Sequence, residues 1–164
     1  MKAFAIPAKY PGRLAIATRP RGGEWIENDM MLFVRGGWQV LISTLEYDEV
    51  RELALVGEQS MAEEKGVTFI SFPIKDRGTP GVAKAMELVL SIKSLLLAGS
   101  HVAVHCRMGI GRSGLICAAT MVALGAMPDS AWATLSSVRV VAVPDTEEQR
   151  RWLEVFRRAL EPRR

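Results

Sequence analysis

Apolar and polar positions follow two different periods along this chain, and the change from one period to the other predicts its elements. Short apolar runs rich in β-branched residues predict buried strands, whereas longer segments with an apolar stripe at helical spacing predict helices. The predicted strands are residues 14–17, 39–45, 67–72 and 101–105. The predicted helices are residues 25–34, 48–56, 60–65, 82–97, 112–124, 128–138 and 146–160.

The order of these elements predicts the fold class. Strands that alternate with helices indicate an α/β fold with a mostly parallel central sheet, flanked by helices on both faces. No internal repeat, low-complexity tract or long linker occurs, so we expect a single domain over residues 1–164. A proline follows residues 14–17 closely, which favours an edge strand there. Residues 73–80 hold two prolines and a glycine and predict a loop.

Composition and charge narrow the class of protein. The chain is 49% hydrophobic and 24% charged, as in ordinary globular proteins. No run reaches the roughly 18–20 apolar residues of a membrane span, and no apolar block near the N-terminus resembles a signal peptide. The two cysteines, Cys106 and Cys117, form no disulfide framework, so we expect a reduced, cytoplasmic protein. The net charge of +3 suits an anionic substrate without requiring nucleic acid, and the sequence leaves the oligomeric state open.

Residues 105–114 carry the chemistry that the sequence indicates most strongly. A predicted buried strand delivers Cys106 to a tight turn, and a predicted helix begins at Arg112. Gly109 and Gly111 allow the backbone to curl so that several N–H groups point inward and form an anion site. The helix N-terminus adds positive potential at the same point, and both effects favour a thiolate at Cys106. Arg112 has the planar guanidinium that can hold two phosphate oxygens.

This segment resembles the signature loop of the protein tyrosine and dual-specificity phosphatase superfamily, His-Cys-x-x-Gly-x-x-Arg-Ser/Thr. All fixed positions are present, namely His105, Cys106, Gly109, Arg112 and Ser113. The resemblance implies a phosphatase without metal or other cofactor, in which Cys106 attacks phosphorus and Ser113 donates a hydrogen bond to the departing thiolate. It also implies that His105 orients the loop. The phosphate-binding positions that it implies are Arg107, Met108, Gly109, Ile110, Gly111 and Arg112.

A proton donor is expected opposite the thiolate, because an alkoxide leaves poorly. Asp76 lies in the predicted loop of residues 73–80, after a predicted strand and before Cys106. The superfamily carries an aspartate on a mobile loop in this place, so the resemblance implies that Asp76 is the general acid. Turn chemistry in Asp-Arg-Gly is the alternative explanation. Asp145 is expected instead to cap the last helix, with Glu148 completing a capping box.

The sequence allows two interpretations for several residues near these motifs. Arg107 either helps to select anionic substrates or is a solvated surface residue. Arg19 and Trp25 either form a substrate-facing loop or, for Trp25, anchor the core. Glu46 and Asp48 follow a predicted strand and either line the pocket rim or are solvated.

The C-terminal part of the chain adds supporting positions. Arg139 and Gln149 lie in a segment that resembles one found in compact members of the superfamily. Gln149 either orients the hydrolytic water or lies on a helix surface. Cys117 falls within a markedly apolar helix, so we expect it in the core. Residues 150–164 are rich in arginine and predict a solvated helix with an apolar stripe, with membrane attachment as the minor alternative.

Length and loop composition favour a compact, dual-specificity-like phosphatase that acts on a phosphorylated protein or a small phosphate ester. The same chemistry on a phosphoinositide or another small-molecule phosphate is the main alternative. Two other classes are a phosphate-binding module without turnover and an arsenate- or sulfur-handling enzyme. Retention of both Cys106 and Arg112 argues against the first, and the position of the loop after Asp76 argues against the second.

Overall fold

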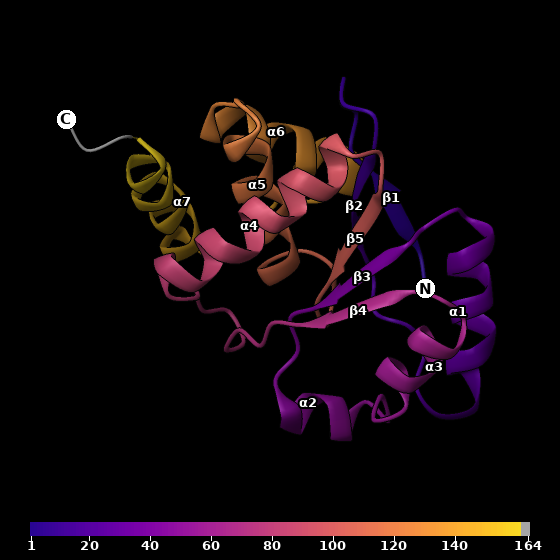
Figure 1. Ribbon diagram of the computed structural model, residues 1–164. Coiled ribbons are helices and arrows are strands. Elements are labelled where there is room, and N and C mark those ends of the chain that lie inside the picture. Colours follow the sequence, from indigo (N-terminus) through magenta and orange to yellow (C-terminus); the bar gives the residue numbers. More distant parts are fainter. Residues whose placement is uncertain (162–164) are drawn as a thin grey trace.

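The computed structural model describes residues 1–161 as a five-stranded sheet with helices on both faces (Figure 1). The order of strands in the sheet is β1-β2-β5-β3-β4, and every neighbouring pair is parallel except β1 with β2. The α/β class and the mostly parallel sheet are therefore confirmed. The strands are β1 (Ala3–Ala5), β2 (Arg13–Ala17), β3 (Val40–Ser43), β4 (Thr68–Ser71) and β5 (His101–His105).

Every helix that the sequence predicts is present, with bounds shifted by a few residues at most. Helices α4 to α7 cover one face of the sheet, and α1 and α3 cover the other (Figure 1). None of the helices within residues 1–161 is long and apolar enough to cross a membrane. The helices are η1 (Gly23–Trp25, a 3-10 turn), α1 (Ile26–Arg35), α2 (Tyr47–Glu52), α3 (Glu58–Glu64), α4 (Val82–Leu97), α5 (Arg112–Ala123), α6 (Pro128–Arg139) and α7 (Glu147–Leu160).

The two faces of the sheet bury two separate apolar clusters. In β2, Leu14 and Ile16 point into the cluster under α4 and α5, while Ala15 and Ala17 point toward α1. This division follows from the period of two in a strand. All four side chains are fully buried, so β2 is a core strand.

The prediction of an edge strand at residues 14–17 is therefore wrong. β1 pairs antiparallel with the outer side of β2, with Phe4 opposite Ile16, so that β2 lies between β1 and β5. β1 has only three residues and no alternating pattern of its own, and so gave no local signal. The proline that suggested an edge, Pro20, lies beyond the end of the strand, where the chain leaves the sheet.

The parallel strands bring four loops to one edge of the sheet. Ligands in α/β sheets bind at the carboxyl ends of strands, where these loops begin. β5 leads into the Cys106 loop (residues 106–111), and β4 leads into the Asp76 loop (residues 72–81). β3 leads into α2, and β2 leads into the segment around Arg19. Residues that are distant in sequence thus meet at this edge.

Candidate active site

The Cys106 loop joins β5 to the first turn of α5 and directs polar groups at the sulfur. Cys106 is 3% exposed, and its Sγ accepts the Gly109 N–H at 3.2 Å and lies 3.2 Å from Ser113 Oγ. Gly109 has a φ of +67°, and a side chain there would overlap the carbonyl of Ala17. Glycine alone satisfies both conditions, so Gly109 allows the loop to curl as the sequence predicts.

Gly111 has a different reason to be glycine. Its φ is −76°, which any residue adopts, but a Cβ would overlap the Asp145 carboxylate and lie 3.2 Å from Gln149 Nε2. The prediction that Asp145 caps α7 with Glu148 is wrong, because Thr146 Oγ1 accepts the N–H of Gln149 at 3.1 Å. Asp145 lies against the Cys106 loop instead.

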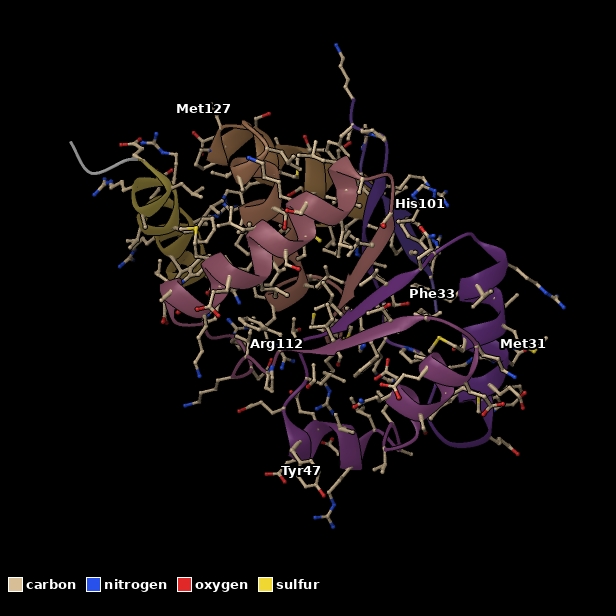
Figure 2. The ribbon with its side chains drawn as sticks, viewed as in Figure 1. Met31, Phe33, Tyr47, His101, Arg112 and Met127 are labelled. Atoms are coloured by element: carbon tan, nitrogen blue, oxygen red, sulfur yellow. The ribbon has the colours of Figure 1, made fainter. Side chains whose placement is uncertain are left out.

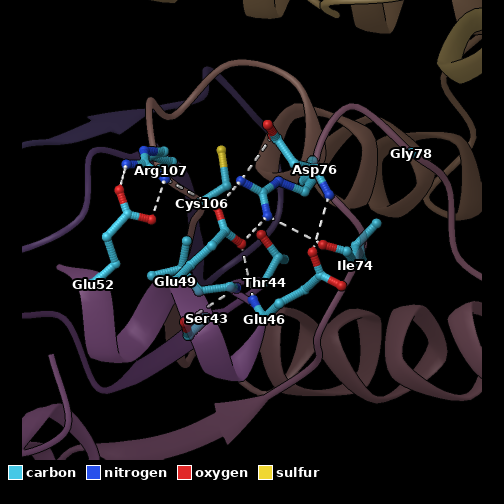
Figure 3. A network of polar contacts seen from close by, with 12 residues as sticks. Ser43, Thr44, Glu46, Glu49, Glu52, Ile74, Asp76, Gly78, Cys106 and Arg107 are labelled. Carbon is cyan, nitrogen blue, oxygen red and sulfur yellow. Dashed lines mark hydrogen bonds and ion pairs between the residues drawn. The ribbon is translucent and has the colours of Figure 1, made fainter.

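The guanidinium of Arg112 is fixed at the edge of the sheet by two carboxylates (Figures 2 and 3). Its Nη1 and Nη2 donate to the two carboxylate oxygens of Glu49 at 2.6 and 2.8 Å, and Nη1 also donates to the Ile74 carbonyl at 3.1 Å. Nη2 lies 3.2 Å from Asp76 Oδ1. This arrangement holds the guanidinium plane in one orientation beside Cys106.

The pair of Arg112 and Glu49 favours the charged form of both side chains. Burial alone would lower the pKa of Arg112, but the hydrogen bond to Glu49 and the charges of Cys106 and Glu49 raise it. Burial likewise raises the pKa of Glu49, but hydrogen bonds from Arg112 and the Glu46 N–H, with the charges of Arg112 and Arg107, hold it below its usual range. Both partners of the pair are therefore charged near neutral pH.

Glu49 is a site residue that the sequence analysis missed. Of the neighbours considered there, Glu46 lines the rim, since its Oε2 accepts the Asp76 N–H at 3.4 Å and its N–H donates to Glu49 Oε2 at 3.0 Å. Asp48 is exposed. Helical spacing was the available signal for Glu49. Residues three apart lie on the same face of a helix, so Glu49 and Glu46 both face the ends of the strands.

The Asp76 loop is held in place by α7. Gln149 Nε2 donates to the Gly78 carbonyl at 3.1 Å, and Trp152 Nε1 donates to the Pro80 carbonyl at 2.7 Å. The Asp76 side chain itself remains 62% exposed at the mouth of the Cys106 loop (Figure 3). Gln149 is fully buried, so the interpretation of it as a helix-surface residue is wrong.

His105 lies beneath the Cys106 loop with both ring nitrogens near oxygen atoms. Nδ1 is 3.2 Å from the Cys106 carbonyl, and Nε2 is 2.9 Å from Oε1 of Glu58. A carbonyl only accepts, so the first contact is a hydrogen bond in the tautomer that has its hydrogen on Nδ1. Both side chains are buried. Sequence reasoning missed Glu58 because the predicted helix began at Ser60, whereas α3 begins at Glu58 itself.

Arg107 and the segment after β2 lie on the other side of the mouth. Arg107 Nη2 pairs with Glu52 at 2.6 Å, and the arginine side chain is 36% exposed (Figure 3). Arg19, Trp25 and Glu52 line one shallow hollow of the surface. Trp25 is 50% exposed and stacks on the guanidinium of Arg21 at 4.5 Å, so it is not a core anchor.

Arg139, at the end of α6, binds the outside of the Cys106 loop. Its Nε donates to the Gly109 carbonyl at 2.6 Å and its Nη2 to the Met108 carbonyl at 3.2 Å. The guanidinium rests on the ring of Phe4, 4.2 Å from the centroid. These two hydrogen bonds hold the Gly109 and Met108 carbonyls of the loop in place. Met108 itself is exposed, whereas Ile110 packs partly against the core.

The second cysteine takes no part in this site. Cys117 is fully buried in α5, as predicted, and burial raises the pKa of its thiol, as does the charge of Cys106. Both cysteines are free thiols. Among residues 1–161, no group of three or more His, Cys, Asp or Glu side chains is arranged to hold a metal ion.

The fold and the Cys106 loop together define the class of cysteine-dependent phosphatases. A family model described as "Polymorphic toxin system, DSP-PTPase phosphatase" matches residues 17–126. Since this match covers more than half of the chain, the protein belongs to that family of dual-specificity-like phosphatases, within the protein tyrosine phosphatase superfamily.

Solved structures and a curated relative agree with this assignment. Kinase associated phosphatase, with serine in place of its catalytic-site cysteine, has a TM-score of 0.84 at 22% identity, covering 90% of this chain and 87% of that one. Tk-PTP in its active form has a TM-score of 0.75 at 23% identity and coverages of 94% and 97%. PTPMT1 in complex with PI(5)P has a TM-score of 0.75 at 19% identity and coverages of 90% and 91%. Cyclin-dependent kinase inhibitor 3 of Rattus norvegicus is 29% identical over 97 residues, which span 58% of this chain but only 46% of the rat protein.

Proposed function

We propose that this protein hydrolyses phosphate monoesters without a metal ion, through a phosphocysteine formed on Cys106. The observation that carries the proposal is the pair of polar contacts on Cys106 Sγ, from the Gly109 N–H and Ser113 Oγ. Donors aimed at sulfur stabilise a thiolate, which is the nucleophilic form. The inward N–H groups of the loop and the N-terminus of α5 then provide an anion site for the phosphate oxygens.

In the first step the thiolate attacks phosphorus and the ester oxygen departs. Arg112 binds two phosphate oxygens, and Glu49 holds its guanidinium plane ready for them. The incoming phosphate takes the place on Nη2 that Asp76 occupies at 3.2 Å. Asp76, released toward the ester oxygen, donates the proton that the leaving alkoxide needs.

In the second step water cleaves the phosphocysteine and returns the thiolate. The S–P bond breaks with its electron pair on sulfur, so negative charge develops on Cys106. Ser113 Oγ lies 3.2 Å from this sulfur and donates a hydrogen bond to it as the charge appears.

Replacing Cys106 with serine tests the nucleophile. We expect phosphate release from p-nitrophenyl phosphate with EDTA present, and we expect the Cys106→Ser variant to lose it, because an alcohol is not ionised in this loop. Binding of vanadate by the variant shows that the loop is still folded. Equal activity of both proteins would contradict the proposal, and a phosphopeptide retained without phosphate release would favour a binding module.

Replacing Asp76 with asparagine tests the general acid. We expect hydrolysis of an alkyl phosphate to fall about 100-fold or more, within the range for general acids. Hydrolysis of p-nitrophenyl phosphate should change much less, because nitrophenolate leaves without a proton. The matched control is Asp48→Asn, an exposed carboxylate of α2. An equal loss on both substrates would contradict the role of Asp76.

The substrate that we propose is a phosphorylated protein, with phosphotyrosine and phosphothreonine or phosphoserine all accepted. The exposed position of Asp76 and the shallow hollow beside Arg107 support a wide mouth that takes side chains of different length. A phosphoinositide is the second candidate, supported by the fold shared with PTPMT1 in its PI(5)P complex. Phosphate release from a phosphotyrosine peptide, a phosphothreonine peptide and soluble PI(5)P, compared by kcat/KM, decides between them. The two free thiols support our proposal of a cytoplasmic, reducing location.

A further inference from the structure

The shallow hollow between the segment after β2 and helix α2 carries positive charge that the proposed reaction does not use. Arg19, Arg21 and Glu52 are among the residues that line it. Arg21 is neutralised by the buried Asp29, whose carboxylate accepts from the arginine Nη2 at 2.6 Å. Within residues 1–161, Arg19 forms no ion pair and donates to the carbonyl of its neighbour Pro20 at 3.0 Å. Arg19 is therefore a cation that can bind an anionic group in the hollow.

Arg107 connects this hollow to the place where the phosphate binds in the proposed reaction. Its Nη2 and Nη1 donate to the two carboxylate oxygens of Glu52 at 2.6 and 3.3 Å, and Figure 3 shows Arg107 between Cys106 and Glu52. Arg107 Nη1 also lies 3.9 Å from Oε1 of Glu49, the oxygen that accepts from Arg112 Nη2 at 2.8 Å. The two guanidinium groups thus contact one carboxylate oxygen. A substrate whose phosphate is bound by Arg112 therefore has its neighbouring groups within reach of Arg107.

Glu52 occupies the position on Arg107 that a carboxylate of a ligand would take. The Glu52 side chain is 62% exposed and that of Arg107 is 36% exposed. Ion pairs between exposed side chains contribute little to stability, so a carboxylate from another molecule can replace Glu52 at small cost. The two hydrogen bonds of the pair show that Arg107 is oriented to bind both oxygens of a carboxylate, as arginine does in bidentate pairs.

We propose that Arg107 and Arg19 bind an acidic side chain next to the phosphorylated residue of a protein substrate, an inference that rests on the function proposed above. The acidic side chain replaces Glu52 on Arg107, and Arg19 adds a second positive charge in the same hollow. Successive Cα atoms are about 3.8 Å apart, so a glutamate one or two positions from the phosphorylated residue reaches the hollow. The exposed ring of Trp25 gives the peptide an apolar surface there. The group that Arg107 binds in this structure is a carboxylate, which favours an acidic peptide over a second phosphate of a lipid.

Steady-state kinetics with two phosphotyrosine peptides test the inference. The peptides differ only in the residues that flank the phosphotyrosine, which are glutamate in one and glutamine in the other. We expect kcat/KM of the unchanged protein to be about fivefold higher for the acidic peptide, with a ratio that shrinks as salt is raised. The ratio should fall to about one in Arg107→Met, fall partly in Arg19→Met, and rise in Glu52→Gln, which lacks the competing carboxylate. Arg51→Met, at an exposed arginine of α2, is the control and should keep the ratio. A ratio is compared because a general loss of activity cancels in it.

Four outcomes would overturn the inference. They are equal kcat/KM for both peptides in the unchanged protein, an unchanged ratio in Arg107→Met, and an equal fall in Arg51→Met, which would show a general effect of charge. The fourth is a preference for soluble phosphatidylinositol bisphosphate over both peptides that Arg107→Met abolishes, which would assign the hollow to a lipid phosphate. Affinities of Cys106→Ser for the two peptides should show the same ratio without turnover. Failure of the proposed function is thereby distinguished, because Cys106-dependent phosphate release would then be absent while the ratio of affinities still tests the hollow.

Discussion

At the scale of single residues, the site depends on how Glu49 and Arg112 share two hydrogen bonds in a buried place. A bidentate pair fixes the plane of the guanidinium as well as its position. Glu49 accepts from both Nη1 and Nη2 of this plane, and Asp76 lies 3.2 Å from Nη2. In the function that we propose, this pair sets the orientation of the guanidinium before a phosphate arrives.

Replacing Glu49 with glutamine should weaken both phosphate binding and stability. The neutral amide cannot accept two charged hydrogen bonds from Arg112, so we expect a loss of about 1–3 kcal/mol in unfolding free energy and weaker vanadate binding. Because the pKa of Glu49 is lowered by folding, its contribution is complete above the unfolded value of about 4.3. This contribution to stability is lost as the pH falls through the lower pKa that Glu49 has in the folded protein.

The difference in unfolding free energy between the two proteins should therefore be largest near neutral pH and shrink below about pH 4. Urea unfolding at several pH values measures it. Glu63→Gln, an exposed position on α3, is the control. A difference that does not vary with pH would contradict the ion-pair account.

At the scale of elements, the end of α6 and strand β1 together support the Cys106 loop from outside. β1 contributes Phe4, and α6 contributes Arg139, whose guanidinium lies between the aromatic ring and two loop carbonyls. A loop that turns its N–H groups inward must turn its carbonyls outward, where they need donors. Arg139 supplies these donors to the Gly109 and Met108 carbonyls, so β1 supports the Cys106 loop through it.

Replacing Arg139 with methionine should impair catalysis without unfolding the protein. The apolar stem is kept, but the donors to Gly109 and Met108 are lost, which leaves the loop free to rotate its peptide groups. We expect kcat/KM for p-nitrophenyl phosphate to fall about tenfold or more, as for the loss of one charged hydrogen bond. Arg158→Met, on the exposed face of α7, is the control. Unchanged vanadate affinity in Arg139→Met would contradict this role.

At the scale of the whole molecule, the C-terminal helix fixes a loop that comes much earlier in the sequence. α7 packs on α4 and α5, and from there Gln149 and Trp152 bind the carbonyls of Gly78 and Pro80. Trp152 also stacks on Phe156 with ring centroids 5.2 Å apart, which ties these contacts to the core. The position of Asp76 therefore depends on the docking of α7.

Replacing Trp152 with phenylalanine should loosen the Asp76 loop. The ring still packs on Phe156, but the N–H bond to the Pro80 carbonyl is lost, at a cost of about 1 kcal/mol. This corresponds to a melting temperature lower by roughly 2–4 °C for a domain of this size. Hydrogen exchange in the Asp76 loop should become faster, and hydrolysis of alkyl phosphates should fall more than that of p-nitrophenyl phosphate. Exchange that rises uniformly over the chain would contradict the specific tie.

The elements that sequence reasoning predicted are those with strong local signals. The apolar run of residues 101–105 and the long stripe of residues 82–97 coincide with β5 and α4, because periodicity alone defines such segments. The three-residue strand β1 has no such period and escaped prediction. At the site, the motif residues Cys106 and Arg112 meet as expected, because a strand, a turn and a helix follow one another in the chain.

The sequence by itself determined which chemical groups stand together: a thiol, two glycines and an arginine within eight residues, placed between a buried strand and a helix. Local backbone geometry is enough to bring these groups together, so no distant contact is needed. Only the tertiary structure decided which acidic residues surround them. Glu49, Glu58 and Asp145 look like ordinary helix-terminal carboxylates in the sequence, and their partners are distant in the chain. The order of the strands and the packing of the helices determine those partners, and a local sequence pattern does not contain that information.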